Sequence, residues 1–309
     1  MIPFHGGWRF ALLSLLFPIA LYMPVSCQAD TGIIVPAYFY PGTGGPGGVG
    51  DGWAAMDTAA AKVPLIAILN PDSGPLPGPP DPNYVSAMTN LENAGGKVAA
   101  YVYTNNGSAS LASVESQINT YISQYGSLID GIFLDGTFVI PSTLSYYQSL
   151  DSFIHGLSAS YLVLSNPGQP FLNGVSPSDY LSTADITNVF EGPDTAPPGD
   201  PQFADYPYGQ TWYQSFPSGR FSNIIFDVPG SSLLTDVNRA VALNAGYVFV
   251  TDQNLPNPYG QLPTYWNQEV SDVASASAIP EPGTLSLLML GVLAAIPLGR
   301  TKRRGGTRI

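Results

Sequence analysis

Residues 97–135 read KVAAYVYTNNGSASLASVESQINTYISQYGSLIDGIFLD, and this stretch decides the fold. Its two ends are rich in apolar, β-branched and aromatic residues, which is typical of strands. Between them, residues 110–125 carry apolar side chains at helical spacing. Two strands joined by such a helix are usually parallel neighbours in one sheet. The stretch therefore predicts one βα unit followed by the next strand.

The same pattern extends in both directions through the middle of the chain. Eight apolar runs are expected to be strands, at 32–40, 63–70, 97–104, 131–135, 161–166, 186–191, 222–228 and 246–252. Helical spacing occurs at 83–94, 110–125, 142–158 and 233–242. This repetition predicts an α/β fold, a (β/α)8 TIM-type barrel over residues 30–278. An open doubly wound sheet is the alternative, but the first turn lacks its usual Gly-x-Gly-x-x-Gly.

The amino-terminal end has the features of an export signal. An apolar segment follows Arg9 and ends in small residues, which is typical of a secretory signal peptide over residues 1–29. The single cysteine, Cys27, falls within it, so we expect a mature chain without disulfides. A lipoprotein is the alternative, although residues 24–27 are a poor lipobox.

The carboxyl-terminal end, residues 279–309, combines Pro280-Glu281-Pro282, an apolar run over 283–299 and a basic cluster. The run is at the lower limit for a transmembrane helix. This arrangement resembles the PEP-CTERM sorting signal. The resemblance implies a Gram-negative bacterium that makes exopolysaccharide, transient anchoring in the inner membrane after signal peptidase cleavage, and removal of the tail by an exosortase. The protein would then be extracellular, at the cell surface or in the exopolysaccharide matrix. A plain carboxyl-terminal anchor is the alternative.

Charge excludes a nucleic-acid partner. The formal net charge is −12, and between residues 30 and 279 four basic residues stand beside 21 acids, a net of −17. Such a domain would attract a cationic amino-sugar polymer, and added salt would weaken the attraction. The charge can equally serve solubility.

In a (β/α)8 barrel the chemistry lies at the carboxyl ends of the strands. The expected last residues of the eight runs are nearly all polar: Tyr40, Asn70, Thr104, Asp135, Asn166, Glu191, Asp227 and Asp252. Several acids at one mouth repel one another, which raises at least one pKa. Paired carboxylates are the machinery of glycoside hydrolysis, where one stays protonated and the other is ionised.

The residue inventory argues against other chemistries. After export the only histidine would be His155, in a predicted helix, and no cysteine would remain. A Cys-His dyad is therefore excluded, and a His-rich metal site is disfavoured. No Gly-x-Ser-x-Gly motif accompanies His155, which disfavours a Ser-His-Asp triad. We expect no cofactor and no metal, and we expect His155 to be structural.

Six blocks of sequence, in order, resemble the spherulin-4-like family. They are residues 32–41, 63–71, 94–104, 130–135, 188–191 and 262–266, and the likeness covers 31–275. The family is related to glycoside hydrolase families 135 and 114. The resemblance implies endo-acting hydrolysis of α-1,4-linked galactosamine or N-acetylgalactosamine polymers. It also implies Asp135 as nucleophile or transition-state stabiliser and Glu191 as general acid/base, with either order of roles open.

The chain departs from the family pattern at one position. The family's strand-four motif ends Asp-Glu, whereas Gly136 follows Asp135 here. The alternative function is therefore a non-catalytic polysaccharide-binding or structural surface protein with a degenerate site. An N-acetyl group of the substrate could also supply the nucleophile.

Six further residues are candidates for binding the polysaccharide: Tyr40, Asn70, Tyr103, Asn166, Asp227 and Asp252. The two tyrosines can stack on sugar rings. The two asparagines can bind hydroxyls, although each precedes a proline and can instead form a turn. The two aspartates can bind a hydroxyl or an amine, or remain solvated loop residues. The aromatic residues over 206–213 are additional candidates, and Asp130 is expected at the opposite, stabilising face of the barrel.

Overall fold

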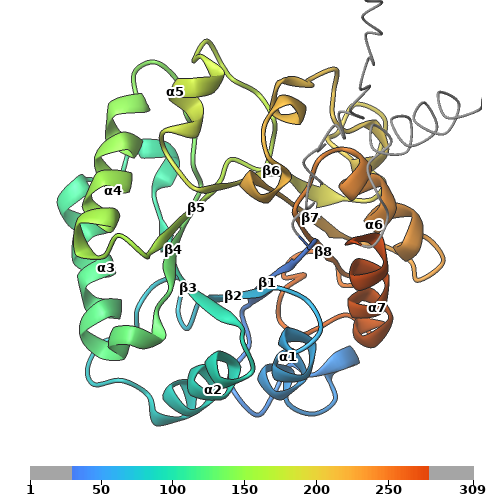
Figure 1. Ribbon diagram of the computed structural model, residues 1–309, viewed down its shortest axis with the longest axis horizontal. Helices are drawn as coiled ribbons and strands as arrows, with labels where there is room; N and C mark the ends of the chain where they lie inside the picture. Colours follow the sequence, from blue (N-terminus) through green and yellow to red (C-terminus); the bar gives the residue numbers. More distant parts are fainter. Residues whose placement is uncertain (1–29, 278–309) are drawn as a thin grey trace, which may run out of the picture.

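The computed structural model describes residues 30–277 (Figure 1). The predicted signal peptide, sorting signal and membrane-spanning segment lie outside these residues. Within 30–277, no helix has both the length and the apolar character needed to span a bilayer.

Eight parallel strands pair in chain order, β1 to β8. They are β1 (Ile33–Ala37), β2 (Leu65–Leu69), β3 (Lys97–Tyr103), β4 (Gly131–Asp135), β5 (Leu162–Asn166), β6 (Ile186–Pro193), β7 (Phe221–Phe226) and β8 (Tyr247–Val250). Gly32, just before β1, bridges to Tyr247 in β8, and its N–H donates to the Gly246 carbonyl over 2.8 Å. This contact closes the sheet, so the (β/α)8 TIM-type barrel is confirmed and the open sheet is wrong.

Helices form a ring outside the strands (Figure 1). They are α1 (Gly52–Ala60), α2 (Pro82–Asn93), α3 (Leu111–Tyr125), α4 (Leu144–Leu157), α5 (Pro177–Leu181), α6 (Leu233–Ala242) and α7 (Trp266–Ser277). Local chemistry sets several of their starts. The Asp81 side chain accepts from the Asn83 N–H ahead of α2, and Ser110 accepts from the Ser113 N–H ahead of α3. Between β6 and β7 the chain instead makes a long loop with three short 3-10 turns.

Alternation along the strands separates two layers of core. One layer lies between the strands and the helices, and its members include Ile33 and Val35. The other fills the barrel interior, with Ile34, Tyr101 and Phe133 among its members. Side chains that face the barrel interior continue toward the carboxyl ends of the strands, where polar residues replace apolar ones.

A β-bulge in β6 changes which side chains face inward. The register between β6 and β7 shifts between Asn188 and Phe190, so that Glu191 pairs with Ile224. Asn188 pairs with Ser222, which lies two residues before Ile224 in β7 and therefore on the same face of that strand. Glu191 thus faces the barrel interior, as Asn188 does. Under strict alternation from Asn188, Phe190 would point inward and Glu191 outward. The bulge therefore aims a carboxylate, rather than a phenyl ring, into the barrel mouth.

Candidate active site

Two carboxylates meet at the barrel mouth, and one amide holds both of them. Asp135 ends β4, Asn166 ends β5, and Glu191 follows the bulge in β6. The Asn166 Nδ2 donates to Asp135 Oδ1 over 2.8 Å and to Glu191 Oε2 over 2.5 Å. These two oxygens therefore lie within about 5.3 Å of each other, the sum of the two bond lengths. The structure thus brings together Asp135, Asn166 and Glu191.

Two tyrosines bind the remaining carboxylate oxygens. The Tyr101 hydroxyl donates to Asp135 Oδ2 over 2.6 Å, and the Tyr259 hydroxyl donates to Glu191 Oε1 over 2.5 Å. Tyr38 packs edge-on against both rings, with centroid distances of 5.8 Å and 5.5 Å. Each carboxylate is therefore oriented at both oxygens. Burial is the main cause of the raised pKa of all three tyrosines, so they remain protonated donors.

The electrostatic surroundings of Glu191 favour its protonated form. Burial is the largest cause, and the Asp135 charge adds to it, so that the pKa of Glu191 is raised above 4.5. Hydrogen bonds from Tyr259 and Asn166 oppose the shift without cancelling it. A carboxyl group with a raised pKa beside a second carboxylate is the arrangement that a general acid requires.

A second layer of polar contacts fixes the orientation of the bridging amide. The Asn188 Nδ2 donates to Asn166 Oδ1 over 2.8 Å, and the Ser222 hydroxyl donates to Asn188 Oδ1 over 3.1 Å. Because the Asn166 oxygen accepts from Asn188, its NH₂ group faces the two acids. Asn188 and Ser222 therefore act as positioning residues through Asn166.

Gly136, at which the chain departs from the sequence pattern of the family it resembles, has a backbone conformation and surroundings that favour glycine. Its φ is +59°, and a Cβ there would lie 2.4 Å from Cε2 of Tyr103. The Tyr103 ring thus occupies the space that the missing side chain would enter. Position 136 and the Tyr103 ring are therefore structurally coupled, because a glutamate there would have to displace the ring.

We expect Gly136→Glu to lower the free energy of unfolding by about 2–3 kcal/mol, because it adds a strained φ to a clash with Tyr103. Urea unfolding would measure this. The double variant Gly136→Glu/Tyr103→Ala should recover the part caused by the clash and keep the part caused by backbone strain. Gly136→Ala should already show both parts, because its Cβ meets the Tyr103 ring. A loss below about 0.5 kcal/mol for Gly136→Glu would contradict the coupling.

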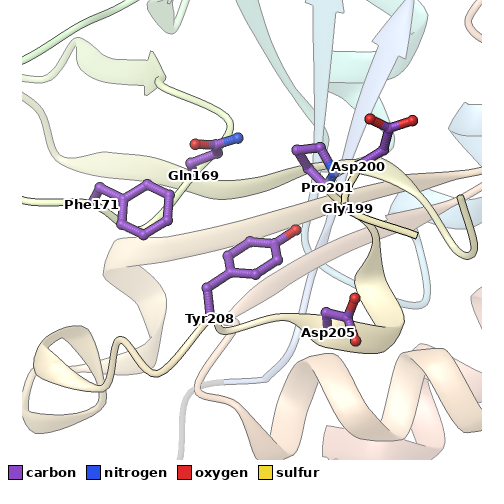
Figure 2. A pocket seen from close by; sticks show the side chains of 7 residues that line it. All are labelled: Gln169, Phe171, Gly199, Asp200, Pro201, Asp205 and Tyr208. Atoms are coloured by element: carbon purple, nitrogen blue, oxygen red, sulfur yellow. The ribbon is translucent and has the colours of Figure 1, made fainter. Parts of the chain in front are cut away.

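One pocket opens beside the carboxylate pair, and a second pocket adjoins the first. One, of about 320 Å³, is lined by Asn166, Pro167, Gly168, Gln169, Glu191 and Phe226. The other, of about 330 Å³, is shown in Figure 2, and Gln169 lines it as well. The shared residue makes the two pockets neighbours. In residues 30–277 no group of three or more His, Cys, Asp or Glu side chains could hold a metal ion.

The other predicted binding residues lie at the mouth in different roles. Tyr103 is 44% exposed, and Tyr40, 42% exposed, donates its hydroxyl to Asp81. Asn70 forms the predicted turn, because its Oδ1 accepts from the Gly74 N–H over 3.1 Å. Asp252 accepts from the backbone N–H and the hydroxyl of Thr264, which ties down the loop before α7. Asp227 follows β7 with a φ of +55°.

The aromatic residues over 206–213 divide into buried and partly exposed members. Tyr206 and Tyr213 are 1% and 0% exposed and pack in the core with Phe190 and Phe221. Their burial excludes them as sugar-stacking platforms, so that interpretation is wrong for these two. Tyr208 remains partly exposed.

Sequence reasoning gave no role to three members of the site, Tyr101, Asn188 and Ser222, and listed Tyr38 and Tyr259 only among the aromatic residues that could stack on sugars. Tyr101 could have been found, because it lies on β3 at the inward parity, opposite Phe133. Asn188 could have been found in the same way, from its position two residues after Ile186. Tyr259 reaches the site from a loop, for which no strand periodicity exists.

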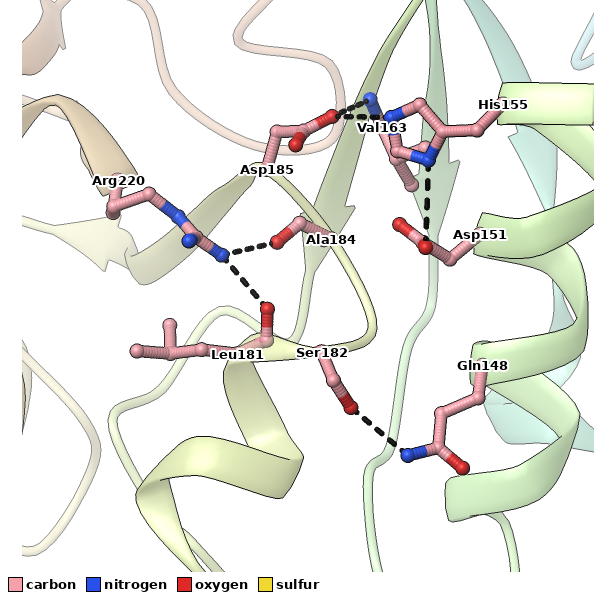
Figure 3. A network of polar contacts seen from close by, with 9 residues as sticks. All are labelled: Gln148, Asp151, His155, Val163, Leu181, Ser182, Ala184, Asp185 and Arg220. Carbon is pink, nitrogen blue, oxygen red and sulfur yellow. Dashed lines mark hydrogen bonds and ion pairs between the residues drawn. The ribbon is translucent and has the colours of Figure 1, made fainter. Parts of the chain in front are cut away.

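His155 lies far from the pair, in a network near the amino-terminal ends of β5 and β6 (Figure 3). Its Nδ1 lies 3.4 Å from Asp151 and its Nε2 lies 3.2 Å from Asp185. Asp185 also accepts from the Val163 N–H over 2.9 Å. Asp130 likewise accepts from the Val98 N–H over 2.8 Å at the amino-terminal ends of the strands, as expected for the stabilising face.

This network predicts a pH-dependent contribution to stability. Burial lowers the pKa of His155, but Asp151 and Asp185 outweigh burial and raise the pKa above 6.5. The contribution is therefore full below the unfolded pKa and is lost as the pH rises through the folded pKa. Urea unfolding at pH 6 and pH 8.5 should show wild type losing up to about 1 kcal/mol relative to His155→Gln. If the stability of wild type over His155→Gln stays constant or grows as the pH rises, the ion pairs of His155 are refuted.

Comparisons with known proteins identify the relatives of this chain. The family model for spherulation-specific family 4 matches residues 32–273, and the PEP-CTERM protein-sorting motif matches residues 278–304. Spherulin-4 of Physarum polycephalum is 31% identical over 280 residues, which cover 86% of this chain and 78% of that protein. The crystal structure of Aspergillus clavatus Sph3 in complex with GalNAc superimposes with a TM-score of 0.61 at 24% identity. That match covers 80% of this chain and 99% of Sph3, and it shows a shared fold.

Proposed function

The chain belongs to spherulation-specific family 4, and from this premise we propose that it is an exported glycoside hydrolase. Its proposed substrate is an exopolysaccharide that contains galactosamine or N-acetylgalactosamine, cleaved within the chain. The GalNAc in the Sph3 complex supports this sugar class. The observation that carries the proposal is the pair Asp135 and Glu191, bridged by one amide within about 5.3 Å.

This upper limit fits a retaining reaction, for which the carboxyl groups of known enzymes lie about 5–5.5 Å apart, better than the wider spacing of an inverting one. Asp135, whose carboxylate is oriented by Tyr101 and Asn166, attacks the anomeric carbon. Glu191 gives its proton to the leaving glycosidic oxygen as the C–O bond breaks. Glu191 then takes a proton from water, which attacks the same carbon and releases Asp135. The raised pKa of Glu191 suits this exchange of acid and base roles.

Exposed residues around the barrel mouth supply surfaces for binding the polymer. We propose Tyr40 and Tyr103 as platforms for sugar rings, because both rings are more than two-fifths exposed, Tyr103 at the end of β3 and Tyr40 in the loop after β1. Asp227, which follows β7 at the same mouth, can accept from a hydroxyl or an amine. Asn70 and Asp252 support the loops around it.

The location follows from the two ends of the chain. The PEP-CTERM motif over 278–304 implies export and exosortase processing. We propose that the protein passes through an inner-membrane intermediate and reaches the surface or matrix of a Gram-negative bacterium, where exopolysaccharide is found.

The test is to incubate the purified full chain with galactosamine-containing exopolysaccharide and count new reducing ends. The blank is the double variant Asp135→Asn/Glu191→Gln. Release above this blank supports the hydrolase. Binding of the polymer without release supports the second candidate, a non-catalytic polysaccharide-binding protein, which the glycine at position 136 favours.

A further inference from the structure

The second pocket beside the active site combines aromatic and acidic residues from two loops. Gln169 and Phe171 come from the β5–α5 loop, and Gly199, Asp200, Pro201, Asp205 and Tyr208 come from the long β6–β7 loop (Figure 2). We propose that this pocket is a remote subsite for a hexosamine unit whose amino group is free and protonated. The proposal rests on the proposed function, because it concerns the same polymer.

The pocket lies where a polymer chain leaving the carboxylate pair can reach it. Gln169 lines both this pocket and the one that contains Asn166 and Glu191. A chain with one unit at the pair can therefore place a later unit in the second pocket. An endo-acting enzyme needs such contacts beyond the bond that it cleaves, because remote binding positions the reacting unit.

An aromatic wall offers the apolar contact that a sugar ring needs. The Phe171 and Tyr208 rings are nearly parallel, at 25°, with centroids 6.0 Å apart. Tyr208 has a φ of +55°, which is uncommon for a bulky residue, and its hydroxyl donates to the Gln202 carbonyl over 3.1 Å. Aromatic side chains with a few placed polar groups are the usual lining of small-molecule sites.

Two carboxylates supply the polar part and select for positive charge. Asp200 and Asp205 are exposed and lie across the pocket from Phe171 in Figure 2. One Asp205 oxygen accepts from Gln202 Nε2 over 2.6 Å. None of the seven lining residues is basic. An ammonium group here would gain charge-assisted hydrogen bonds, whereas an N-acetyl group carries no charge to match the carboxylates.

The basic side chains of the described residues do not compete for these acids. Lys62 precedes β2 and Lys97 is the first residue of β3, at the opposite end of the barrel. Arg220 donates to the carbonyls of Leu181 and Ala184. Arg239 donates to the carbonyls of Ala204 and Tyr206 and lies 5.1 Å from the centroid of the Phe203 ring.

The loop that carries the acids is anchored before any ligand binds. Phe203 and Tyr206, on either side of Asp205, are buried, and Arg239 in α6 donates to the carbonyls of Ala204 and Tyr206. The neighbouring Asp205 and Tyr208 are therefore held on a fixed base. Such preorganisation lowers the entropy lost on binding.

The experiment measures binding to oligosaccharides of equal length, one fully N-acetylated and one fully de-N-acetylated. Calorimetry would use the full chain in the non-cleaving Asp135→Asn/Glu191→Gln background, so that binding is read whether or not the wild type hydrolyses the polymer. We expect the de-N-acetylated oligomer to bind about tenfold more tightly at low salt, and this preference to shrink as salt is added.

Adding Asp200→Asn/Asp205→Asn should abolish most of the preference. The matched control, Asp72→Asn/Asp179→Asn, removes two exposed acids elsewhere and should keep it. Phe171→Ala should weaken the binding of both oligomers. Equal effects of the two acid pairs, or no preference at the start, would overturn the subsite. Lost selectivity in a protein that releases no reducing ends would support the subsite and refute the hydrolase.

Discussion

Asp135→Asn is expected to lower kcat for polysaccharide cleavage by roughly a thousandfold or more, because the amide cannot attack the anomeric carbon. Asparagine has nearly the shape of aspartate, and its side-chain oxygen can still accept from Tyr101 or Asn166. The loss should therefore appear in kcat rather than in KM. Reducing-end assays across a range of polymer concentrations would separate the two constants.

Glu191→Gln separates the two proposed roles. General acid catalysis contributes roughly 10²–10⁴-fold, and we expect a loss of this size on the natural polymer. An aryl glycoside with a good leaving group needs no proton, so Glu191→Gln should cleave its first bond at near wild-type rate and then stall. Asp135→Asn should be slow on both substrates. The reverse pattern would exchange the two roles.

The pH profile provides an independent check on Glu191. Because burial and the Asp135 charge raise the pKa of Glu191, the group stays protonated above the usual range of a glutamate. Activity should fall as the pH rises through this pKa, since the acid is then lost. The Glu191→Gln variant should lack this fall in activity at high pH. The Asp72→Asn variant, which removes an exposed acid after β2, should keep it. If the fall in activity at high pH survives in Glu191→Gln, a group other than Glu191 causes it.

The barrel could be predicted from the sequence because its strands are nearly continuous apolar runs. All eight expected runs overlap the observed strands, and the helices expected around 83–94, 110–125, 142–158 and 233–242 are α2, α3, α4 and α6. The predicted ends of the strands were less accurate than their positions. The run expected to end at Tyr40 gives a strand that ends at Ala37, because the Tyr38 N–H turns back to the Pro36 carbonyl over 3.1 Å and leaves the ladder.

The site was only partly predictable, for two physical reasons. The position of Asp135 at the end of β4 followed from periodicity, but the inward direction of Glu191 depends on a bulge that no spacing in the sequence reveals. Local hydrogen bonds decided between the alternatives for other strand-end residues. Asn70 closes a turn with Gly74, whereas Asn166, also before a proline, spans the two acids. The two asparagines look alike until the neighbouring strands are in place.

Asn166→Asp tests the bridge and should have the second large effect. The substitution changes one NH₂ group into an oxygen, so the donor that both Asp135 and Glu191 share becomes a third acid between them. Three carboxylates this close cannot all ionise at neutral pH. We expect a loss of about 2–4 kcal/mol in the free energy of unfolding at pH 8 and at least about a hundredfold loss in kcat.

The stability loss should diminish on acidification, since protonation of the extra acid removes the repulsion and restores a donor. The sign follows from linkage: a carboxyl whose folded pKa is raised takes up a proton on folding, so stability falls as pH rises. Asn188→Ala is the matched control. It removes the partner of the Asn166 oxygen but adds no charge, so it should lower kcat moderately and show no new pH dependence of unfolding. If Asn166→Asp unfolds with the same pH dependence as wild type, the amide does not bridge the pair, and the proposed retaining geometry loses its support.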